Sequence, residues 1–379
     1  MTVKASARGQ RATPSIPDGA ERARDVVVIG AGQAGLATGY FLRRLGLDFA
    51  ILDAHLRVGD AWRHRWDTLR LFTPAFYSGL PGMAFPSADP DHLATRDEAA
   101  DYLESYARRF GLPVEGDTSV RTLRRADGHF LLDTSHGPIA AEQVVVATGA
   151  FQTPVVPAFS ADLDPRIAQL HSSQFTNPES LATGDALVVG AGNSGTQIAT
   201  DIKEAEPMRR VWLSGRDTGL LPRRLLGRDI FRWLAPTILR VRTESRMGRL
   251  IRTRTMGRGD AVLSDAHERM VAAGVERVGR TVGVRDDRPA VQIGSGEPAL
   301  EVASVVWCTG YRPDFSWIEG LPVDEHDIPL HRRGEVTAWP GLYVVGLHFL
   351  SRLSSSLMGG VGDDARHVAA RIASRRAST

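Results

Sequence analysis

Two glycine-rich segments carry the clearest chemical signal in the sequence. Residues 30–35 read Gly-Ala-Gly-Gln-Ala-Gly and residues 190–195 read Gly-Ala-Gly-Asn-Ser-Gly, each between an apolar run and a helix-like stretch. In this pattern the first glycine permits a tight turn, the second lets the backbone approach a pyrophosphate, and the third lets helix and strand pack closely. The freed N–H groups and the helix dipole then hold the phosphates. The candidate dinucleotide ligands are therefore Gly30, Gly32, Gln33, Ala34 and Gly35 in the first segment and Gly190, Gly192, Asn193, Ser194 and Gly195 in the second.

The residue that ends the following strand distinguishes the two segments. Asp53 ends the strand after the first turn, where an acid accepts hydrogen bonds from the ribose 2′-hydroxyl. The second unit instead ends in Ser214, Gly215 and Arg216. A carboxylate there would repel a 2′-phosphate, whereas Arg216 can pair with it bidentately and Ser214 can donate a hydrogen bond. The second site is thus predicted to prefer NADPH to NADH; the alternative is that Arg216 is one of many arginines on solvated loops.

The first site is predicted to bind FAD. Two nicotinamide sites in one chain would achieve little by exchanging hydride, whereas a flavin accepts hydride and can then react with other partners. FAD in the first site and NADPH in the second are therefore the expected cofactors.

The elements around the turns predict an α/β fold with parallel sheets. Residues 25–53 and 186–214 each form a strand, helix, strand unit. The apolar runs at 144–146 and 305–307 each end in a small residue, threonine and glycine. Two dinucleotide-binding, Rossmann-like domains are expected.

The last strand, near residues 342–345, and the last helix, about residues 363–373, complete the first domain, so the NADPH domain is inserted in a discontinuous FAD domain. We expect a disordered tail over residues 1–23, the FAD domain over 24–155 and 300–376, and the NADPH domain over 156–299 with a helical insert at about 218–272.

Composition excludes several function classes. The chain has 46 basic and 44 acidic residues, and its arginines are spread along the sequence, so nucleic-acid binding is set aside. Cys308 is the only cysteine, which rules out an intrachain disulfide, a Cys-x-x-Cys redox pair and a cysteine-based zinc site. The histidines have no metal-ligand spacing, so no metal is expected.

A signal sequence and a transmembrane segment are not expected, so the predicted compartment is cytoplasmic. The stretch 220–252 is rich in arginine, leucine and tryptophan. It could rest on an anionic membrane or cover a substrate channel, but a helical insert packed on the NADPH lobe fits as well, and membrane contact is not favoured. The sequence does not indicate the oligomeric state.

Further motifs extend the pattern over residues 24–373. These are Val58–Arg63, Leu69–Pro74 and Leu357–Ala365. With the two glycine turns, they resemble the flavin-containing monooxygenase superfamily, most closely its small bacterial CzcO-like oxidoreductase branch. The resemblance implies that Asp53 and Trp62 contact FAD, that Val120 lies near the adenine, and that the segment from Gly359 to Asp363 presents a helix N-terminus to the flavin. Trp62 could instead be a core residue.

The resemblance implies an NADPH-dependent flavoprotein monooxygenase. NADPH would reduce FAD, molecular oxygen would add, and a flavin C4a-hydroperoxide would oxygenate a small nucleophilic substrate such as an amine or sulfide. No catalytic side chain is required, and none is assigned.

Two other functions stay open. In the family's identifying pattern only His171 and Phe175 fit, with Pro165 and Ile167 in place of the expected phenylalanine and glycine. This departure favours an NADPH-flavin dehydrogenase that reduces a quinone, a metal complex or a protein carrier. A non-catalytic nucleotide-binding sensor or accessory protein is a further alternative.

Overall fold

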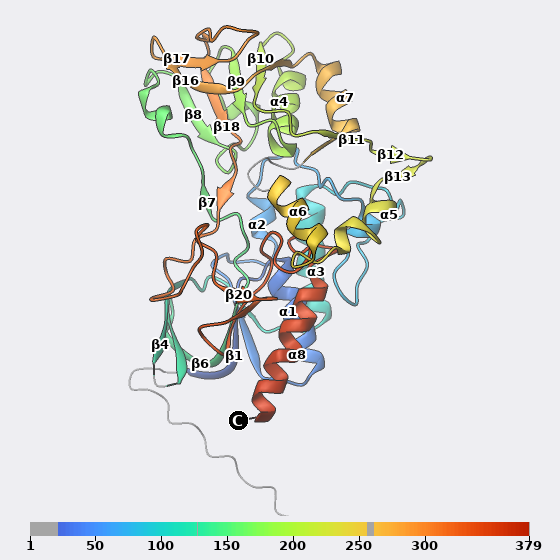
Figure 1. Ribbon diagram of the computed structural model, residues 1–379, viewed down its shortest axis with the longest axis vertical. Helices are drawn as coiled ribbons and strands as arrows, with labels where there is room; N and C mark the ends of the chain where they lie inside the picture. Colours follow the sequence, from blue (N-terminus) through green and yellow to red (C-terminus); the bar gives the residue numbers. More distant parts are fainter. Residues whose placement is uncertain (1–21, 127, 256–260, 379) are drawn as a thin grey trace, which may run out of the picture.

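Two α/β lobes are stacked end to end in the computed structural model, which describes residues 22–126, 128–255 and 261–378 (Figure 1). The lower lobe in Figure 1 contains both chain ends of the described structure, and the upper lobe is formed by the middle of the chain. The expected tail lies outside the described residues up to residue 21, and the first strand already begins at Arg22.

The first lobe is organised around a nine-stranded mixed sheet. Its central strands are parallel and almost fully buried, which explains their continuous apolar sequences. In sheet order the main path is β20 (His331–Arg332), β21 (Glu335–Val336), β22 (Leu342–Val344), β6 (Gly137–Val146), β1 (Arg22–Ile29), β2 (Phe49–Leu52) and β3 (Val114–Glu115), while the antiparallel pair β4 (Val120–Ala126) and β5 (His129–Thr134) branches from β6.

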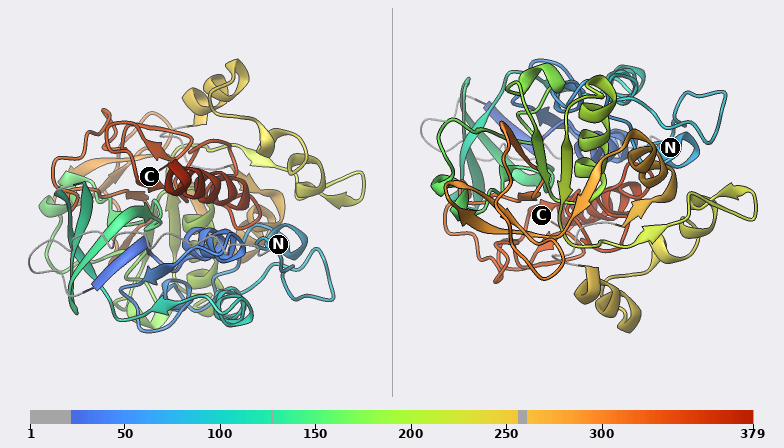
Figure 2. Two further views of the ribbon diagram at one scale, coloured as in Figure 1. Left: turned by 90° about the horizontal axis from the view of Figure 1, so that it is seen from below. Right: turned by 90° about the horizontal axis from the view of Figure 1, so that it is seen from above.

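Three helices pack together in the first lobe. The first and last helices of the chain, α1 (Gln33–Arg44) and α8 (Gly362–Ser378), lie side by side (Figure 2), and α3 (Arg96–Arg109) packs against α1. A capping box between Thr95 and Glu98 begins α3. The pairing of α1 with α8 and of β6 with β22 confirms that the end of the chain completes the first domain. Shorter pieces of this lobe are α2 (Asp60–Arg63) and the 3₁₀ turn η1 (Ala75–Tyr77).

The second lobe contains a five-stranded sheet whose strands are all parallel. Its order is β15 (Glu276–Val278), β10 (Val211–Ser214), β9 (Ala186–Val189), β18 (Ser304–Trp307) and β8 (Ala168–His171). The helices α4 (Asn193–Ala205) and α7 (Ser264–Ala273) pack against each other, and the hairpin β16 (Thr281–Arg285) and β17 (Arg288–Val291) lies beyond the sheet. The 3₁₀ turns are η2 (Ala158–Asp162) and η3 (Pro178–Ser180).

The chain crosses between the lobes twice, and the two crossings pair with each other. The outgoing segment β7 (Thr153–Pro154) is antiparallel to the returning segment β19 (Tyr311–Arg312) (Figure 1). The expected boundary at residue 300 is therefore wrong. Residues 304–307 form β18, which lies between β9 and β8 in the second sheet, so the return to the first lobe follows Trp307.

The insert leaves the second lobe after β10 and projects to one side of the molecule (Figures 1 and 2). Its buried residues Phe231 and Leu263 pack with Phe72 and Tyr77 of the first lobe. It is less helical than expected, and α7 is not part of it, because that helix packs on α4 and leads into β15. The insert contains β11 (Leu220–Leu221) paired with β14 (Val262–Leu263), β12 (Arg224–Leu225) paired with β13 (Arg228–Asp229), α5 (Phe231–Leu234), η4 (Ile238–Arg240) and α6 (Arg246–Thr255).

Over the described ranges, no helix combines the length and apolar character needed to cross a membrane.

Candidate cofactor sites

The first glycine turn links β1 to α1 and is fixed by close backbone contacts. Gly30 has a φ of +106°, and its N–H donates to the carbonyl of Leu52 at 2.7 Å. A Cβ on Gly30 would lie 2.7 Å from the carbonyl oxygen of Ala147, and a Cβ on Gly35 would lie 1.8 Å from that of Gly30. Only glycine fits at these two positions.

The second turn repeats this geometry between β9 and α4. Gly190 has a φ of +114°, and its N–H donates to the carbonyl of Ser214 at 2.7 Å. A Cβ on Gly190 would lie 2.2 Å from the carbonyl oxygen of Cys308, and one on Gly195 would lie 1.8 Å from that of Gly190. Ala147 and Cys308 begin the two matched Thr-Gly strand ends, so each of these ends supports one glycine turn.

The middle glycine of each turn faces open space. A Cβ built on Gly32 or Gly192 meets nothing within 4 Å. Both residues are N-caps of helices without a side-chain cap and without an acid in the first turn. The exposed N–H groups and the positive helix end therefore remain available to an anion, and the open space fits a pyrophosphate.

The neighbouring predicted residues differ in exposure. Gln33 is half-buried, and its side-chain amide donates to the carbonyl of Ser356 at 3.2 Å, which ties the first turn to the segment before α8. Ala34 is buried, so its backbone is the part that could serve a ligand. In the second turn Asn193 is half-buried and Ser194 is exposed.

Asp53 lies beside the first turn. Its Oδ2 accepts a hydrogen bond from the N–H of Ala31 at 2.5 Å, and its Oδ1 accepts one from the N–H of His55 at 2.8 Å and contacts the His55 ring at 3.0 Å. Burial alone would raise the pKa of Asp53, but the hydrogen bonds from His55 and Ala31 outweigh it and lower the pKa. The lowered pKa keeps Asp53 ionised, so its carboxylate can accept hydrogen bonds from ribose hydroxyls.

One small pocket gathers four of the predicted residues. Gly32, Gln33, Asp53 and Trp62 all line it. Sequence reasoning missed the other polar residues of this wall, because their place depends on how the loop after β2 folds back. The further lining residues are Ala31, His55, Arg57, Gly59, Asp60, Ala61 and Leu103.

His55 is the most informative of the missed residues. Its hydrogen bond to Asp53 raises the pKa of the imidazole against the opposing effect of burial. A histidine charge at this place would complement a phosphate or the Asp53 carboxylate. The only sequence signal is its position two residues after Asp53.

Trp62 lies on the short helix α2 and is half-buried, with its side chain packed partly against the core of the lobe. This partial burial is compatible with a core role, and contact of Trp62 with FAD stays a prediction. Arg63 fixes the helix, because its guanidinium donates to Asp60 at 3.0 Å and to Glu104 of α3 at 2.7 Å.

Val120 is half-buried and begins β4. It lies two residues after Thr118, whose N–H donates to the carbonyl of Asp53 at 2.8 Å.

The segment before α8 packs tightly on the loop after β2. A Cβ on Gly359 would lie 1.9 Å from the carbonyl oxygen of Tyr77. Asp363 is half-buried in the first turn of α8 and forms an ion pair with Arg352. Its neighbour Asp364, which sequence reasoning did not select, is the buried carboxylate: it accepts a hydrogen bond from Ser351, and its Oδ2 has no partner among the described residues.

The structure corrects the expectation for Ser214. This residue is fully buried, and its hydroxyl donates to the carbonyl of Gly279 at 2.8 Å and lies 2.7 Å from the Thr281 hydroxyl. Its side chain points into the joint between β10 and β16, so it does not reach a nucleotide. Arg216 is exposed at the turn after β10, consistent with access to a ligand.

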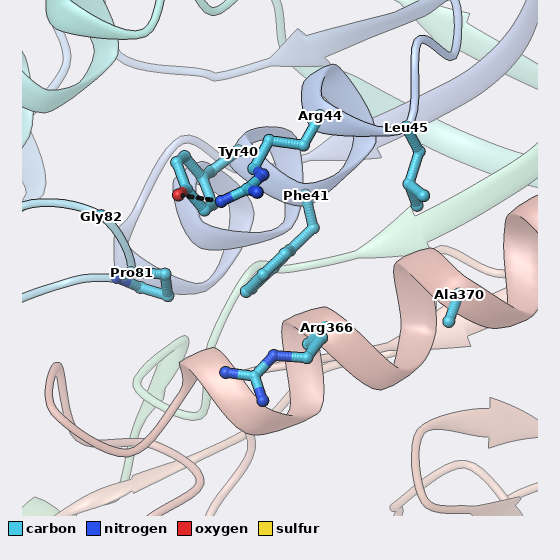
Figure 3. A pocket seen from close by; sticks show the side chains of 8 residues that line it. All are labelled: Tyr40, Phe41, Arg44, Leu45, Pro81, Gly82, Arg366 and Ala370. Carbon is cyan, nitrogen blue, oxygen red and sulfur yellow. Dashed lines mark hydrogen bonds between the residues drawn. The ribbon is translucent and has the colours of Figure 1, made fainter.

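A larger hollow, of about 620 Å³, lies on the outer surface between α1 and α8. In Figure 3 the Phe41 ring and the Arg366 guanidinium face each other across it, and Arg44 reaches the Tyr40 hydroxyl. This hollow is at the C-terminal end of α1. Because phosphates bind at helix N-termini, it is not the dinucleotide site despite its size.

A network of rings joins the lobes at the crossing strands. The Arg65 guanidinium donates to the Tyr311 hydroxyl at 2.8 Å and lies 5.9 Å from the centre of the exposed Phe151 ring. His171 packs edge-on against Tyr311, and its Nδ1 accepts the N–H of Ser173, so Nε2 carries the proton toward the carbonyl of Gly310. Burial lowers the pKa of His171.

Two Rossmann-like units in one chain, each with an open glycine turn and joined by paired crossing strands, define a two-domain dinucleotide oxidoreductase. The family described as pyridine nucleotide-disulphide oxidoreductase matches residues 27–346, and the chain belongs to that family.

Relatives place the chain more closely. It is 41% identical over 349 residues to an uncharacterized CzcO-like oxidoreductase of Geobacillus kaustophilus, covering 91% of this chain and 97% of the relative. It is 35% identical over 347 residues to the uncharacterized oxidoreductase CzcO of Bacillus subtilis, with the same coverage. Among solved structures, the flavin-containing monooxygenase from Stenotrophomonas maltophilia superposes with a TM-score of 0.74 at 26% identity, covering 94% of this chain and 99% of that one.

These findings confirm the resemblance to the CzcO-like branch, the two-domain fold class and the cofactor pair. The chain is an NADPH-dependent flavoprotein oxidoreductase of the flavin-containing monooxygenase superfamily. The assignment of individual residues to each cofactor stays a prediction.

Proposed function

We propose that the chain is a monooxygenase that uses NADPH and molecular oxygen to oxygenate a small nucleophilic substrate, such as an amine or a sulfide. The observation that carries the proposal is the pair of open glycine turns, one in each lobe of the same chain. Bound FAD would supply the oxygen-transfer chemistry, through the C4a-hydroperoxide that the family resemblance implies.

The residues at the first turn fit FAD. The N-terminus of α1 would hold the pyrophosphate, and the Asp53 carboxylate would accept the ribose hydroxyls. The half-buried Trp62 would close the wall of the pocket that it shares with Asp53. At the second turn, the N-terminus of α4 would hold the pyrophosphate of NADPH, with Arg216 at the 2′-phosphate.

Thiol chemistry does not fit this chain. Cys308 is its only cysteine, so the two thiols that a disulfide relay requires are missing. Burial also raises the pKa of the Cys308 thiol to about 12, which keeps it protonated and unreactive at neutral pH. The family's disulfide-reducing chemistry is therefore not proposed for it.

The insert is suited to exclude water from the reaction. Arg223 of the insert donates to the carbonyl of Phe72 at 2.8 Å, and Phe231 packs on Phe72 and Tyr77. Tyr77 in turn contacts Gly359, in the segment expected at the flavin end. The insert thus covers the loop that borders this end, and a covered site favours transfer of oxygen to substrate over release of peroxide.

The test is a set of linked steady-state assays on the FAD-loaded protein. NADPH oxidation, oxygen uptake and hydrogen peroxide release are measured with a panel of small amines and sulfides. We expect at least one substrate to give oxygenated product in proportion to NADPH, with peroxide release falling as product rises. The dehydrogenase would be supported instead by two results together. Every substrate would leave hydrogen peroxide release equal to NADPH oxidation, and a quinone would accelerate NADPH oxidation in the absence of oxygen.

A further inference from the structure

Arg277 lies across the carboxyl end of β10. It belongs to β15, the edge strand next to β10, where it is in register with Leu213. Its Nη1 donates to the carbonyls of Leu213 at 2.8 Å and Val278 at 3.1 Å, and its Nη2 donates to the carbonyl of Gly215 at 3.4 Å. The guanidinium is therefore held at the turn that also carries Arg216.

This turn is the place where a Rossmann unit reads the ribose. In such units the group at the end of the second strand contacts the 2′ position. Here that end lies directly against the glycine turn, because a Cβ on Gly215 would be 2.8 Å from the nitrogen of Ala191. Arg277 brings a second positive charge to this end, from a strand that is far away in the sequence.

The electrostatic surroundings of Arg277 suit an anion. Among the described residues no carboxylate forms an ion pair with it, although the charge of Asp217 acts on it from nearby. Arg210, at the opposite end of β10, differs, because it is paired with Glu276 of β15 at 2.6 Å. The bonds of Arg277 within the described structure use Nη1 and Nη2, which leaves its Nε–H and a second Nη2–H as the side-on fork that binds phosphate.

We propose that Arg277 binds the 2′-phosphate of NADPH together with Arg216 and supplies the contact that buried Ser214 cannot make. The inference rests on the NADPH site proposed at the second turn. It makes Arg277 a specificity-determining residue, because NADH has no group for this guanidinium to bind.

The competing explanation is that Arg277 only caps the strand-end carbonyls of Leu213 and Gly215. A capping role would stabilise the turn for every nucleotide alike. The two roles are separated by comparing ligands that differ only in the 2′-phosphate, namely 2′,5′-ADP and 5′-AMP.

The experiment is calorimetric titration of the FAD-loaded protein with these two ligands. Arg277→Gln should weaken binding of 2′,5′-ADP by about tenfold or more, the effect of a charge-assisted hydrogen bond, and change that of 5′-AMP less than about twofold. Arg277→Lys should keep part of the preference, and Arg216→Ala should act in the same direction as Arg277→Gln. The control Arg210→Gln removes the same charge at the opposite end of β10 and should leave the ratio unchanged.

An equal loss for both ligands in Arg277→Gln, or an unchanged preference for 2′,5′-ADP, would overturn the inference while leaving the NADPH site in place. A wild-type protein that binds 2′,5′-ADP no better than 5′-AMP would overturn both.

Discussion

The N–H of Ala31 donates a hydrogen bond to Asp53 Oδ2 across 2.5 Å, so the residue that follows β2 is tied to the middle of the first glycine turn. The same carboxylate holds the ring of His55 at 3.0 Å. Turn, strand end and the start of the next loop are thus fixed as one unit before any cofactor binds. Such preorganisation reduces the entropy lost on binding.

Replacement of Asp53 by asparagine should weaken FAD binding. The amide is uncharged and offers one acceptor oxygen, so hydrogen bonds worth about 1.5–3 kcal/mol to a charged group are lost. Titration of the apoprotein with FAD, followed by flavin fluorescence, measures the change. Asp48→Asn, at an exposed position before β2, is the matched control. Equal FAD affinity in Asp53→Asn and wild type would contradict the assignment.

The glycine turns allow folding and binding to be separated. Gly32→Ala and Gly192→Ala place a methyl group in open space, so the thermal midpoint of the apoprotein should stay nearly unchanged. That methyl group occupies the expected pyrophosphate position, so Gly32→Ala should lose FAD, and Gly192→Ala should retain FAD but bind NADPH weakly.

The third glycines should behave in the opposite way. Gly35→Ala and Gly195→Ala force a methyl group to within 1.8 Å of a carbonyl oxygen, so both should lower stability by about 1–3 kcal/mol even without ligand. The same loss of stability in all four variants would argue against open cofactor cradles at Gly32 and Gly192.

The insert depends on a buried ion pair between Arg223 and Asp229. Their side chains are 11% and 3% exposed, and Nη2 lies 2.9 Å from Oδ2. Arg223→Met should destabilise the protein by about 3–5 kcal/mol, because Asp229 is left buried and unpaired, and Arg223→Met with Asp229→Leu should recover much of the loss. Denaturant midpoints measure both, with the exposed Arg224→Met as control. A double variant no more stable than Arg223→Met would show that the pair is not the cause.

Asp364 should make stability depend on pH in the acid range. Burial raises the pKa of this carboxyl above its ordinary value of 3.8, and the hydrogen bond from Ser351 and the charge of Arg352 only partly oppose it. The folded protein therefore binds this proton more tightly than the unfolded chain, so its contribution to stability falls as pH rises from about 4 through the raised pKa. Asp364→Asn should gain stability relative to wild type over that rise. Thermal midpoints that differ by the same amount at pH 4 and pH 7 would contradict this.

The Rossmann-like units were predictable from sequence because their glycines answer local steric demands. Gly30 and Gly190 face the carbonyls of Ala147 and Cys308. Ala147 and Cys308 begin the repeated Thr-Gly strand ends, so the repeat in the sequence indicated which strand packs against each glycine turn. The boundary at residue 300 was wrong because β18 ends like β6, and a local pattern does not say which sheet a strand joins.

The parts of the site that sequence missed depend on contacts between distant strands. The Ser214 hydroxyl is directed away from the ligand because it hydrogen-bonds to Gly279 and Thr281. Arg277 reaches the same turn because β15 lies next to β10. Asp363 and Asp364 are adjacent, and only the packing of α8 decides which one is buried.

The most direct test of the account is rapid mixing of the FAD-loaded protein, reduced by NADPH without oxygen, with aerated buffer. The account predicts that NADPH bleaches the flavin absorbance and that oxygen then produces a transient species, distinct from reduced and oxidised flavin, which persists while NADP⁺ is bound. Direct return to the oxidised spectrum would contradict the monooxygenase and favour the dehydrogenase, and failure of NADPH to bleach the flavin would contradict the account as a whole.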